Sequence, residues 1–192
     1  AWDIEKLFRE QGCSELAFSS IVAVGRNSAL PHAIPGGDAV GAELTRLPEN
    51  NLVLVDVGGR LDDYCSDQTR TFWAGEEQGA APTERFRRVR EQVQEAQEKA
   101  IKALRPGLDL KEAYAIARKS FATHGVEVRF THGLGHGIGL ETHEGPSLSA
   151  AARGELSPRM VVTVEPGLYY PEWGGVRWEF MVLITEDGAE VL

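Results

Sequence analysis

The sequence has few cysteines, no long apolar segment and no cluster of basic residues, and each shortage excludes a class of protein. Only two of its 192 residues are cysteines, Cys13 and Cys65, and no Cys-x-x-Cys motif occurs. A cysteine-rich structural zinc site is therefore excluded, and a reducing cytoplasm is favoured. No apolar run approaches the roughly 20 residues of a membrane-spanning helix. Residues 1–12 lack the basic and then apolar pattern of a signal peptide.

The charge is strongly negative, and the rest of the composition is ordinary. The formal net charge is −9 and no basic stripe is present, so neither nucleic acid nor a membrane is an expected partner. Hydrophobic residues make up 42% of the chain and charged residues 26%. This composition and length predict one globular domain over residues 1–192.

Four carboxylates and one imidazole stand out, because each lies in a strand-like or glycine-rich context. They are Asp56, Asp67, His136, Glu165 and Glu179. An isolated buried carboxylate is costly unless it is paired or bound to a metal. Oxygen ligands with one imidazole suit a pair of hard or borderline divalent cations. We therefore interpret the five residues as ligands of two metal ions in a hydrolase.

Structural roles for individual members of this set stay open at this point. Asp67 could pair with Arg70 or cap a turn, and Glu179 could pair with Arg177, which lies on the same face of its strand. Three of the five histidines lie within the glycine-rich sequence HGLGHGIGLETHEGP. Any one of them could be structural, but the cluster His132, His136 and His143 favours a site.

The hydrophobic pattern predicts helices and antiparallel strands. Helices are expected at 3–11, with Asp3 as N-cap, at 83–104, and after Asp109 as the N-cap of a helix closed by Gly125. Expected strands are 18–25, 52–57, 64–73, 160–164 and 176–185, the last strand of the chain. Residues 58–63 are expected to form a turn, residues 27–38 are rich in turn formers, and 130–145 is rich in glycine and histidine.

Two segments of the chain resemble each other and predict a duplication. Residues 44–58 and 156–167 each contain a proline turn, an apolar strand, an acid and a glycine. A second acid follows 11 residues later in one half (67 minus 56) and 14 later in the other (179 minus 165). A pseudo-twofold axis would bring the two carboxylate pairs face to face. The first half has one helix fewer, so we expect apolar surface to be exposed beside helix 3–11.

Longer motifs make the chain resemble a known family. They are LPHAIPG, LVLVDVGG with YCSDQTRTFW, HGLGHGIGLETHE, TVEPGLYYPEWGGVRWE and MVLITEDG. Together they resemble the pita-bread metallopeptidases, in the branch of aminopeptidase P and prolidase. The resemblance implies an α+β pita-bread (creatinase/aminopeptidase-like) fold, with pseudo-twofold duplicated halves and a curved antiparallel sheet that carries helices on its outer face. It also implies a catalytic domain without its first helix and without an N-terminal domain.

The resemblance further implies two divalent metal ions, with manganese first and cobalt or zinc as alternatives. By position, Asp56 would bind one ion through both oxygens, and Asp67 and Glu179 would bridge the two ions. His136 and Glu165 would complete the second metal.

The remaining motif residues would act on a peptide substrate that contains proline. Glu165 would shuttle the proton, His143 would hydrogen-bond the scissile carbonyl, and His32 would line the pocket near the proline. Arg177 would recognise a carboxylate or carbonyl beyond the cleaved bond, and Tyr169 would shape the wall. The implied protein is a cytoplasmic Xaa-Pro aminopeptidase or dipeptidase, and a homodimer is left open.

One departure from the family pattern keeps alternatives open. The family often has Glu-Asp where this chain has Glu179 and Phe180, so the metal affinity or the basicity of Glu179 could differ. The alternatives are a catalytically inactive pita-bread module that binds peptides and an enzyme like methionine aminopeptidase. The intact set of five ligands argues against the first, and the motifs VRWE and EPGLY argue against the second.

Overall fold

The computed structural model describes residues 1–33, 52–79 and 81–192. The described helices are α1 (Trp2–Glu10), α2 (Glu84–Ala103) and α3 (Leu110–Thr123), with short 3-10 turns at Gly25–Ala29, Glu76–Gln78 and Glu127–Arg129. Every strand pair in the described part is antiparallel. Most of the repeat segment 44–58 and part of the motif LPHAIPG lie outside the described residues.

The N-terminal half contains one three-stranded sheet and one smaller sheet. The first has the order β2-β3-β6, and its strands are β2 (Ile21–Val24), β3 (Leu52–Val57) and β6 (Gln68–Trp73). The second has the order β1-β4-β5, with β1 (Glu15–Leu16), β4 (Gly59–Leu61) and β5 (Tyr64–Cys65). The β4–β5 ribbon therefore lies between β3 and β6 in the chain.

The C-terminal half repeats this plan with extra strands. Its main sheet has the order β13-β12-β9-β7-β8, and its ribbon pairs β10 with β11. The strands are β7 (Gly135–Gly137), β8 (Glu144–Leu148), β9 (Val161–Val164), β10 (Gly167–Tyr170), β11 (Gly174–Arg177), β12 (Phe180–Ile184) and β13 (Ala189–Val191). The series β7-β9-β12 matches β2-β3-β6, and the β10–β11 ribbon matches β4–β5.

The duplication places the acids at equivalent points. Asp56 lies near the end of β3 and Glu165 follows β9, whereas Asp67 precedes β6 and Glu179 precedes β12. The halves meet where β6 runs beside β11. There the Thr71 hydroxyl donates to the Arg177 carbonyl at 3.0 Å and accepts from the Arg177 amide at 3.1 Å.

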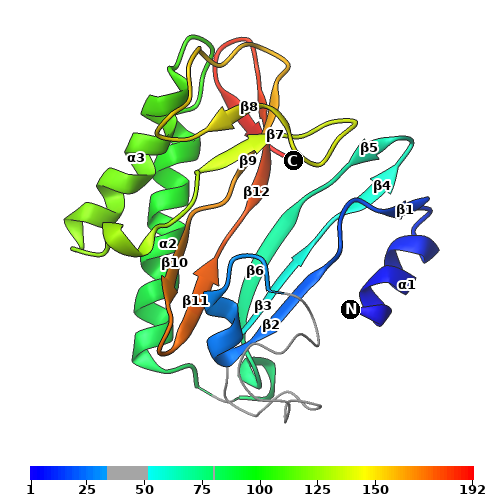
Figure 1. Ribbon diagram of the computed structural model, residues 1–192, viewed down its shortest axis with the longest axis vertical. Helices are drawn as coiled ribbons and strands as arrows, with labels where there is room; N and C mark the ends of the chain where they lie inside the picture. The colour runs from blue at the N-terminus through cyan, green and yellow to red at the C-terminus, as the bar shows by residue number, and fades with distance from the viewer. Residues whose placement is uncertain (34–51, 80) are drawn as a thin grey trace.

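Helices α2 and α3 cover the outer face of the C-terminal sheet (Figure 1). The Thr83 hydroxyl caps α2, and the Asp109 carboxylate caps α3, the latter as predicted. Apolar positions three or four residues apart along α2 and at its C-cap are buried, and they are Phe86, Val89, Val93, Ala96, Ala100 and Leu104. These side chains pack with those of α3 and the strands into one core.

Helix α1 packs differently from the other two. Its N-cap is Ala1, and the predicted cap Asp3 lies in the first turn, where a carboxylate still favours the helix dipole. No residue of α1 is buried, and Trp2 and Leu7 are 75% and 58% exposed. Trp2 and Leu7 thus leave apolar surface of α1 itself exposed. A Cβ added at Gly59 would lie 2.5 Å from the Phe8 ring, so Phe8 packs on β4.

Several predicted strand boundaries were wrong. The expected strands 64–73 and 176–185 are each broken at the acid, into β5 and β6 and into β11 and β12. The expected turn 58–63 contains β4, and β13 follows the strand predicted to be the last. Burial alternates without interruption through the break at Asp67, where Cys65, Asp67 and Thr69 are buried, whereas all four residues of β11 are buried.

None of the described helices combines the length and the apolar character required to cross a bilayer.

Candidate metal centre

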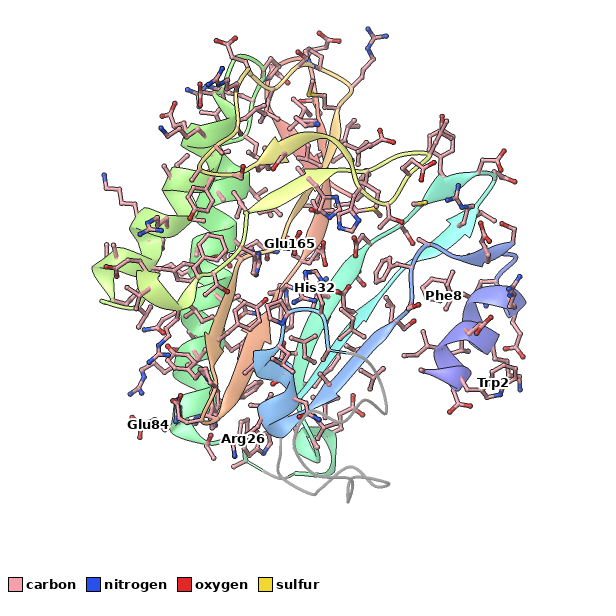
Figure 2. The ribbon with its side chains drawn as sticks, viewed as in Figure 1. Trp2, Phe8, Arg26, His32, Glu84 and Glu165 are labelled. Atoms are coloured by element: carbon pink, nitrogen blue, oxygen red, sulfur yellow. The ribbon has the colours of Figure 1, made fainter. Side chains whose placement is uncertain are left out.

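All five predicted ligands line one cavity of about 520 Å³. It lies between the two halves and is also lined by His32, His143 and Arg177, but not by Tyr169. Figure 2 shows Glu165 and His32 in the middle of the molecule, where the second half faces the first. The duplicated strands thus bring together side chains that are more than 100 residues apart.

Three of the five ligands converge most closely. Asp67, His136 and Glu179 each offer one ligand atom, and these atoms lie within 4.8 Å of one another. The His136 Nε2 atom lies 3.7 Å from Asp67 Oδ2 and 3.5 Å from Glu165 Oε1. A cation in this space would have imidazole and carboxylate donors from both halves of the molecule.

The orientation of the His136 ring suits a metal ligand. Its Nδ1 atom lies 3.0 Å from the Gly137 carbonyl oxygen, which can only accept, so Nδ1 carries the proton. Burial lowers the pKa of His136, so the ring is neutral and the Nε2 lone pair points towards the acids. A backbone partner of this kind is the usual way in which a ligating histidine is held.

Asp56 divides its two oxygens between an arginine and the cavity. Its Oδ2 atom accepts from Arg177 Nη2 at 2.6 Å. Its Oδ1 atom is buried and has no hydrogen-bond partner among the described residues. A buried carboxylate oxygen without a partner is costly, and a cation at this position would satisfy it.

Two threonines orient the two glutamates. The Thr69 hydroxyl donates to Glu179 Oε2 at 2.6 Å and accepts from Arg177 Nε at 3.1 Å. The Thr163 hydroxyl lies 3.5 Å from Glu165 Oε1 and accepts from the His136 amide at 3.1 Å. Neither threonine was predicted from the sequence. The inward positions of β6 carry Thr69, Thr71 and Trp73, and threonine is so common in strands that this pattern gives no distinct signal.

The acids strongly perturb one another in the absence of a cation. Burial and the neighbouring Glu179 and Asp56 carboxylates raise the pKa of Asp67 to about 10. Burial and Asp56 raise the pKa of Glu179 to about 7, and burial followed by Glu179 raises that of Glu165 well above its usual range. Like charges in one buried site resist ionisation. This donor set therefore fits divalent cations, which would favour the ionised carboxylates.

Arg177 begins a buried chain of hydrogen bonds. It is 3% exposed, and its Nη1 donates to the Tyr169 hydroxyl at 2.9 Å and to the Pro31 carbonyl at 3.2 Å. Burial alone would lower the pKa of Arg177, but Tyr169 and Asp56 raise it above its usual range. Most of the guanidinium donors are therefore occupied within the protein, and one Nη2 N–H is left for other contacts.

The chain continues from Tyr169 to His132. Burial raises the pKa of Tyr169 to about 12, so its hydroxyl keeps its proton and lies 2.8 Å from His132 Nε2. His132 Nδ1 lies 2.7 Å from the Gly133 carbonyl oxygen and must donate to it. Nε2 therefore accepts from Tyr169, and burial followed by Arg177 lowers the pKa of His132 to about 4. His132 supports the wall of the cavity in its neutral form.

His143 stacks beside the predicted ligand His136, with ring centroids 4.1 Å apart and planes 36° apart. Its loop is tied to the first half of the molecule. The Cys65 amide donates to the Gly139 carbonyl at 2.8 Å, and Arg60 Nη1 donates to the Leu140 carbonyl at 2.8 Å. These contacts hold the loop against the β4–β5 ribbon.

Arg70 and Phe180 lie behind the last ligand. Arg70 does not pair with Asp67 in the described structure; it donates to the carbonyls of Thr69 and Glu179. Its guanidinium stacks 4.2 Å from the Phe180 ring centroid and 4.8 Å from that of Trp178. Phe180 does not line the cavity. It therefore contacts Arg70 directly behind Glu179.

The chain was compared with known families and proteins. The profile of metallopeptidase family M24 matches residues 1–186. The Xaa-Pro dipeptidase of Pyrococcus furiosus is 42% identical over 189 residues, which cover 98% of this chain and 51% of that protein. The chain thus spans about half the length of the curated relatives that it matches.

The chain is also similar to solved structures of peptidases. The prolidase from Pyrococcus furiosus has a TM-score of 0.90 and 41% identity, over 100% of this chain and 53% of that one. The X-Pro aminopeptidase from Thermotoga maritima has a TM-score of 0.88 and 36% identity, over 97% of this chain and 50% of that one. These neighbours confirm the predicted pita-bread fold, and they favour neither of the alternative functions.

Proposed function

The chain belongs to metallopeptidase family M24, and we propose that it hydrolyses the peptide bond that precedes proline, with two divalent cations held by its five ligands. The observation that carries the proposal is the convergence of Asp67, His136 and Glu179 in one cavity, with their ligand atoms within 4.8 Å of one another. The unpartnered Asp56 Oδ1 and the Glu165 carboxylate near His136 complete the donor set.

The cations would supply Lewis-acid stabilisation of the scissile carbonyl and would make a water molecule more acidic. We assign the proton transfers to Glu165, which lies in the cavity with a raised pKa. Its carboxylate would take a proton from the attacking water and give it to the departing proline nitrogen. His143 would donate a hydrogen bond to the oxygen of the cleaved carbonyl as negative charge develops there.

We propose that His32 lines the part of the pocket that accepts the proline ring, since it is exposed and lines the cavity. Arg177 would act on the metals mainly through Asp56, with one Nη2 N–H left for a substrate carboxylate or carbonyl. Tyr169 would fix the position of Arg177 from behind the wall. An Xaa-Pro bond has no N–H to be recognised, so shape and carbonyl contacts must select it.

Three further proposals come from chemistry and family resemblance. Manganese is the first candidate for the native ion, with cobalt or zinc as alternatives, because a carboxylate-rich set accepts each of them. Cys13 and Cys65 are both free thiols, which agrees with a reducing cytoplasm. The oligomeric state, including a homodimer, is open to direct measurement.

Hydrolysis of defined peptides by the Mn²⁺-loaded chain tests the proposal. We expect cleavage of Ala-Pro or of a longer peptide that begins with Xaa-Pro, and far slower cleavage of Ala-Ala, which has the same length and lacks the imide. A chelator should abolish the activity and added Mn²⁺ should restore it. The ratio of Ala-Pro to longer-peptide cleavage would assign a dipeptidase or an aminopeptidase. Proteolysis that is insensitive to the chelator, or no cleavage by protein with two bound ions, would contradict the proposal.

A further inference from the structure

One polar side chain lies on the apolar face of α2. Gln97 is 2% exposed and lies one helical turn from Val93 and from Ala100, which are fully buried. A buried amide at such a position is costly unless its N–H groups are hydrogen-bonded. Its partners therefore indicate why the helix carries it.

The Gln97 amide binds two carbonyl oxygens. Its Nε2 atom donates to the Val164 carbonyl at 2.9 Å and to the Trp178 carbonyl at 2.9 Å. Both acceptors are carbonyls, so only the NH₂ end of the amide can face them, and each of its two N–H groups has one partner. The residues that follow these carbonyls in the chain are Glu165 and Glu179.

The peptide units in front of both glutamates are consequently held at both ends. The Glu165 amide donates to the Leu134 carbonyl at 2.8 Å, and the Glu179 amide donates to the Thr69 carbonyl at 3.1 Å. These two bonds come from neighbouring backbone, whereas both carbonyl bonds come from one side chain. One side chain, Gln97, is thus hydrogen-bonded to the peptide units that directly precede both glutamates.

Both contacts lie at the end of a strand pair. Val164 ends β9 and is paired with Phe180, the first residue of β12, and beyond this pair the chain continues in the β10–β11 ribbon. Gln97 therefore bonds to the backbone at the point where the two strands diverge.

We propose that Gln97 is a positioning residue for the metal centre, which fixes the separation of Glu165 and Glu179 from behind the sheet. This inference rests on the proposed function, because it assigns both glutamates to the metals. Ligand groups must be held to within about 0.5 Å for productive geometry, and outer partners of ligands typically change metal affinity by about 10- to 100-fold. Loss of both bonds should therefore weaken metal binding without removing a ligand.

The test compares Gln97→Met with Val93→Ala. Methionine keeps the approximate volume and removes both donors, whereas Val93→Ala perturbs the same helix face one turn earlier and touches no hydrogen bond. We expect both variants to melt at a lower temperature than the wild type. Only Gln97→Met should bind Mn²⁺ about 10- to 100-fold more weakly in calorimetric titration and alter the visible spectrum of the Co²⁺-loaded protein.

The outcomes separate the two proposals. A Gln97→Met protein that binds Mn²⁺ as tightly as the wild type, with the same Co²⁺ spectrum, would overturn the positioning role. A wild-type chain that binds no Mn²⁺ would instead overturn the proposed function. If Gln97→Met does not fold, Gln97→Asn keeps the amide but shortens its reach by one methylene. We then expect weaker Mn²⁺ binding than the wild type, and equal binding would overturn the inference.

Discussion

His136 is the only imidazole among the five ligands, and it is the ligand whose loss leaves the fewest other effects. Its Nδ1–H contacts the backbone carbonyl of Gly137. Removing the ring opens space beside His143 but leaves every buried acid in place. The function of His136 can therefore be tested without creating a new unpaired charge.

We predict that His136→Ala loses metal and peptidase activity together. Mn²⁺ affinity should fall by more than the roughly 100-fold that is typical for loss of an outer partner, because a ligand itself is removed. Metal content after dialysis and Ala-Pro hydrolysis are the measurements. His124→Ala is the control, since His124 pairs with Glu95 on the surface. Retained metal in His136→Ala would remove His136 from the ligand set.

Arg177 is the only cation within hydrogen-bonding distance of a ligand carboxylate in the described part of the chain. Arg177→Met would leave Asp56 without its partner, so we expect the metal-free protein to lose about 3–5 kcal/mol of unfolding free energy. Urea denaturation measures this loss. Arg85→Met removes an exposed pair with Glu172 and should cost about 1 kcal/mol or less. A similar loss of unfolding free energy in both variants would contradict a stabilising role for the buried pair of Arg177 and Asp56.

The five predicted ligands, which line one cavity, stand out in the sequence, but the residues that support them do not. Asp56, Asp67, Glu165 and Glu179 are conspicuous because an acid is unusual beside an apolar strand. Thr69, Thr163 and Gln97 have no such contrast, because threonine is common in strands and glutamine in helices. Their roles depend on contacts between distant segments, such as the 81 residues between Gln97 and Trp178.

At the scale of elements, the breaks in the strands carry two of the predicted ligands. Asp67 and Glu179 each lie between a ribbon strand and a sheet strand, where the chain changes partner. The sequence predicted one continuous strand in each place, because the spacing of buried residues does not reveal a change of partner. The duplication, in contrast, could be predicted from the spacing of the acids along the chain.

Strand β7 must approach β9 closely to place His136, and Gly135 permits this approach. A Cβ at Gly135 would lie 1.9 Å from the Thr163 carbonyl oxygen. We predict that Gly135→Ala costs about 1–3 kcal/mol or more of unfolding free energy and weakens metal binding, because β7 must move away. Gly188→Ala, where a Cβ would be 3.8 Å from its nearest neighbour, is the control in thermal melts and Mn²⁺ titrations. A Gly135→Ala protein with the melting temperature and Mn²⁺ affinity of the wild type would contradict the close approach of β7 to β9.

At the scale of the whole molecule, the buried acids link metal binding to pH. Without a cation, the folded-state pKa values of Asp67 and Glu179 are raised to about 10 and about 7. Between its ordinary pKa and this raised value, each group binds more protons in the folded state than in the unfolded state. The metal-free protein therefore loses stability as pH rises, from about 3.8 to about 10 through Asp67 and from about 4.5 to about 7 through Glu179.

We predict that Mn²⁺ raises the melting temperature more at pH 8 than at pH 5. At a free concentration 100 times the dissociation constant, the ion should add about 2.7 kcal/mol, which corresponds to roughly 5–10 °C for a chain of this size. The difference in melting temperature between the Mn²⁺-loaded and the metal-free protein should be smaller at low pH, because protons compete with the ion for the carboxylates and His136. Melting curves of chelated and loaded protein at both pH values measure it. An equal rise in melting temperature at pH 5 and pH 8 would contradict this link between metal binding and pH.

The central claim is that two divalent cations bind among these five side chains. Anomalous diffraction at the manganese edge from Mn²⁺-loaded crystals tests it most directly. We expect two peaks within ligand distance of Asp56, Asp67, His136, Glu165 and Glu179, about 3.5–4 Å apart. The absence of peaks at these residues, or a single ion elsewhere in the molecule, would contradict the account.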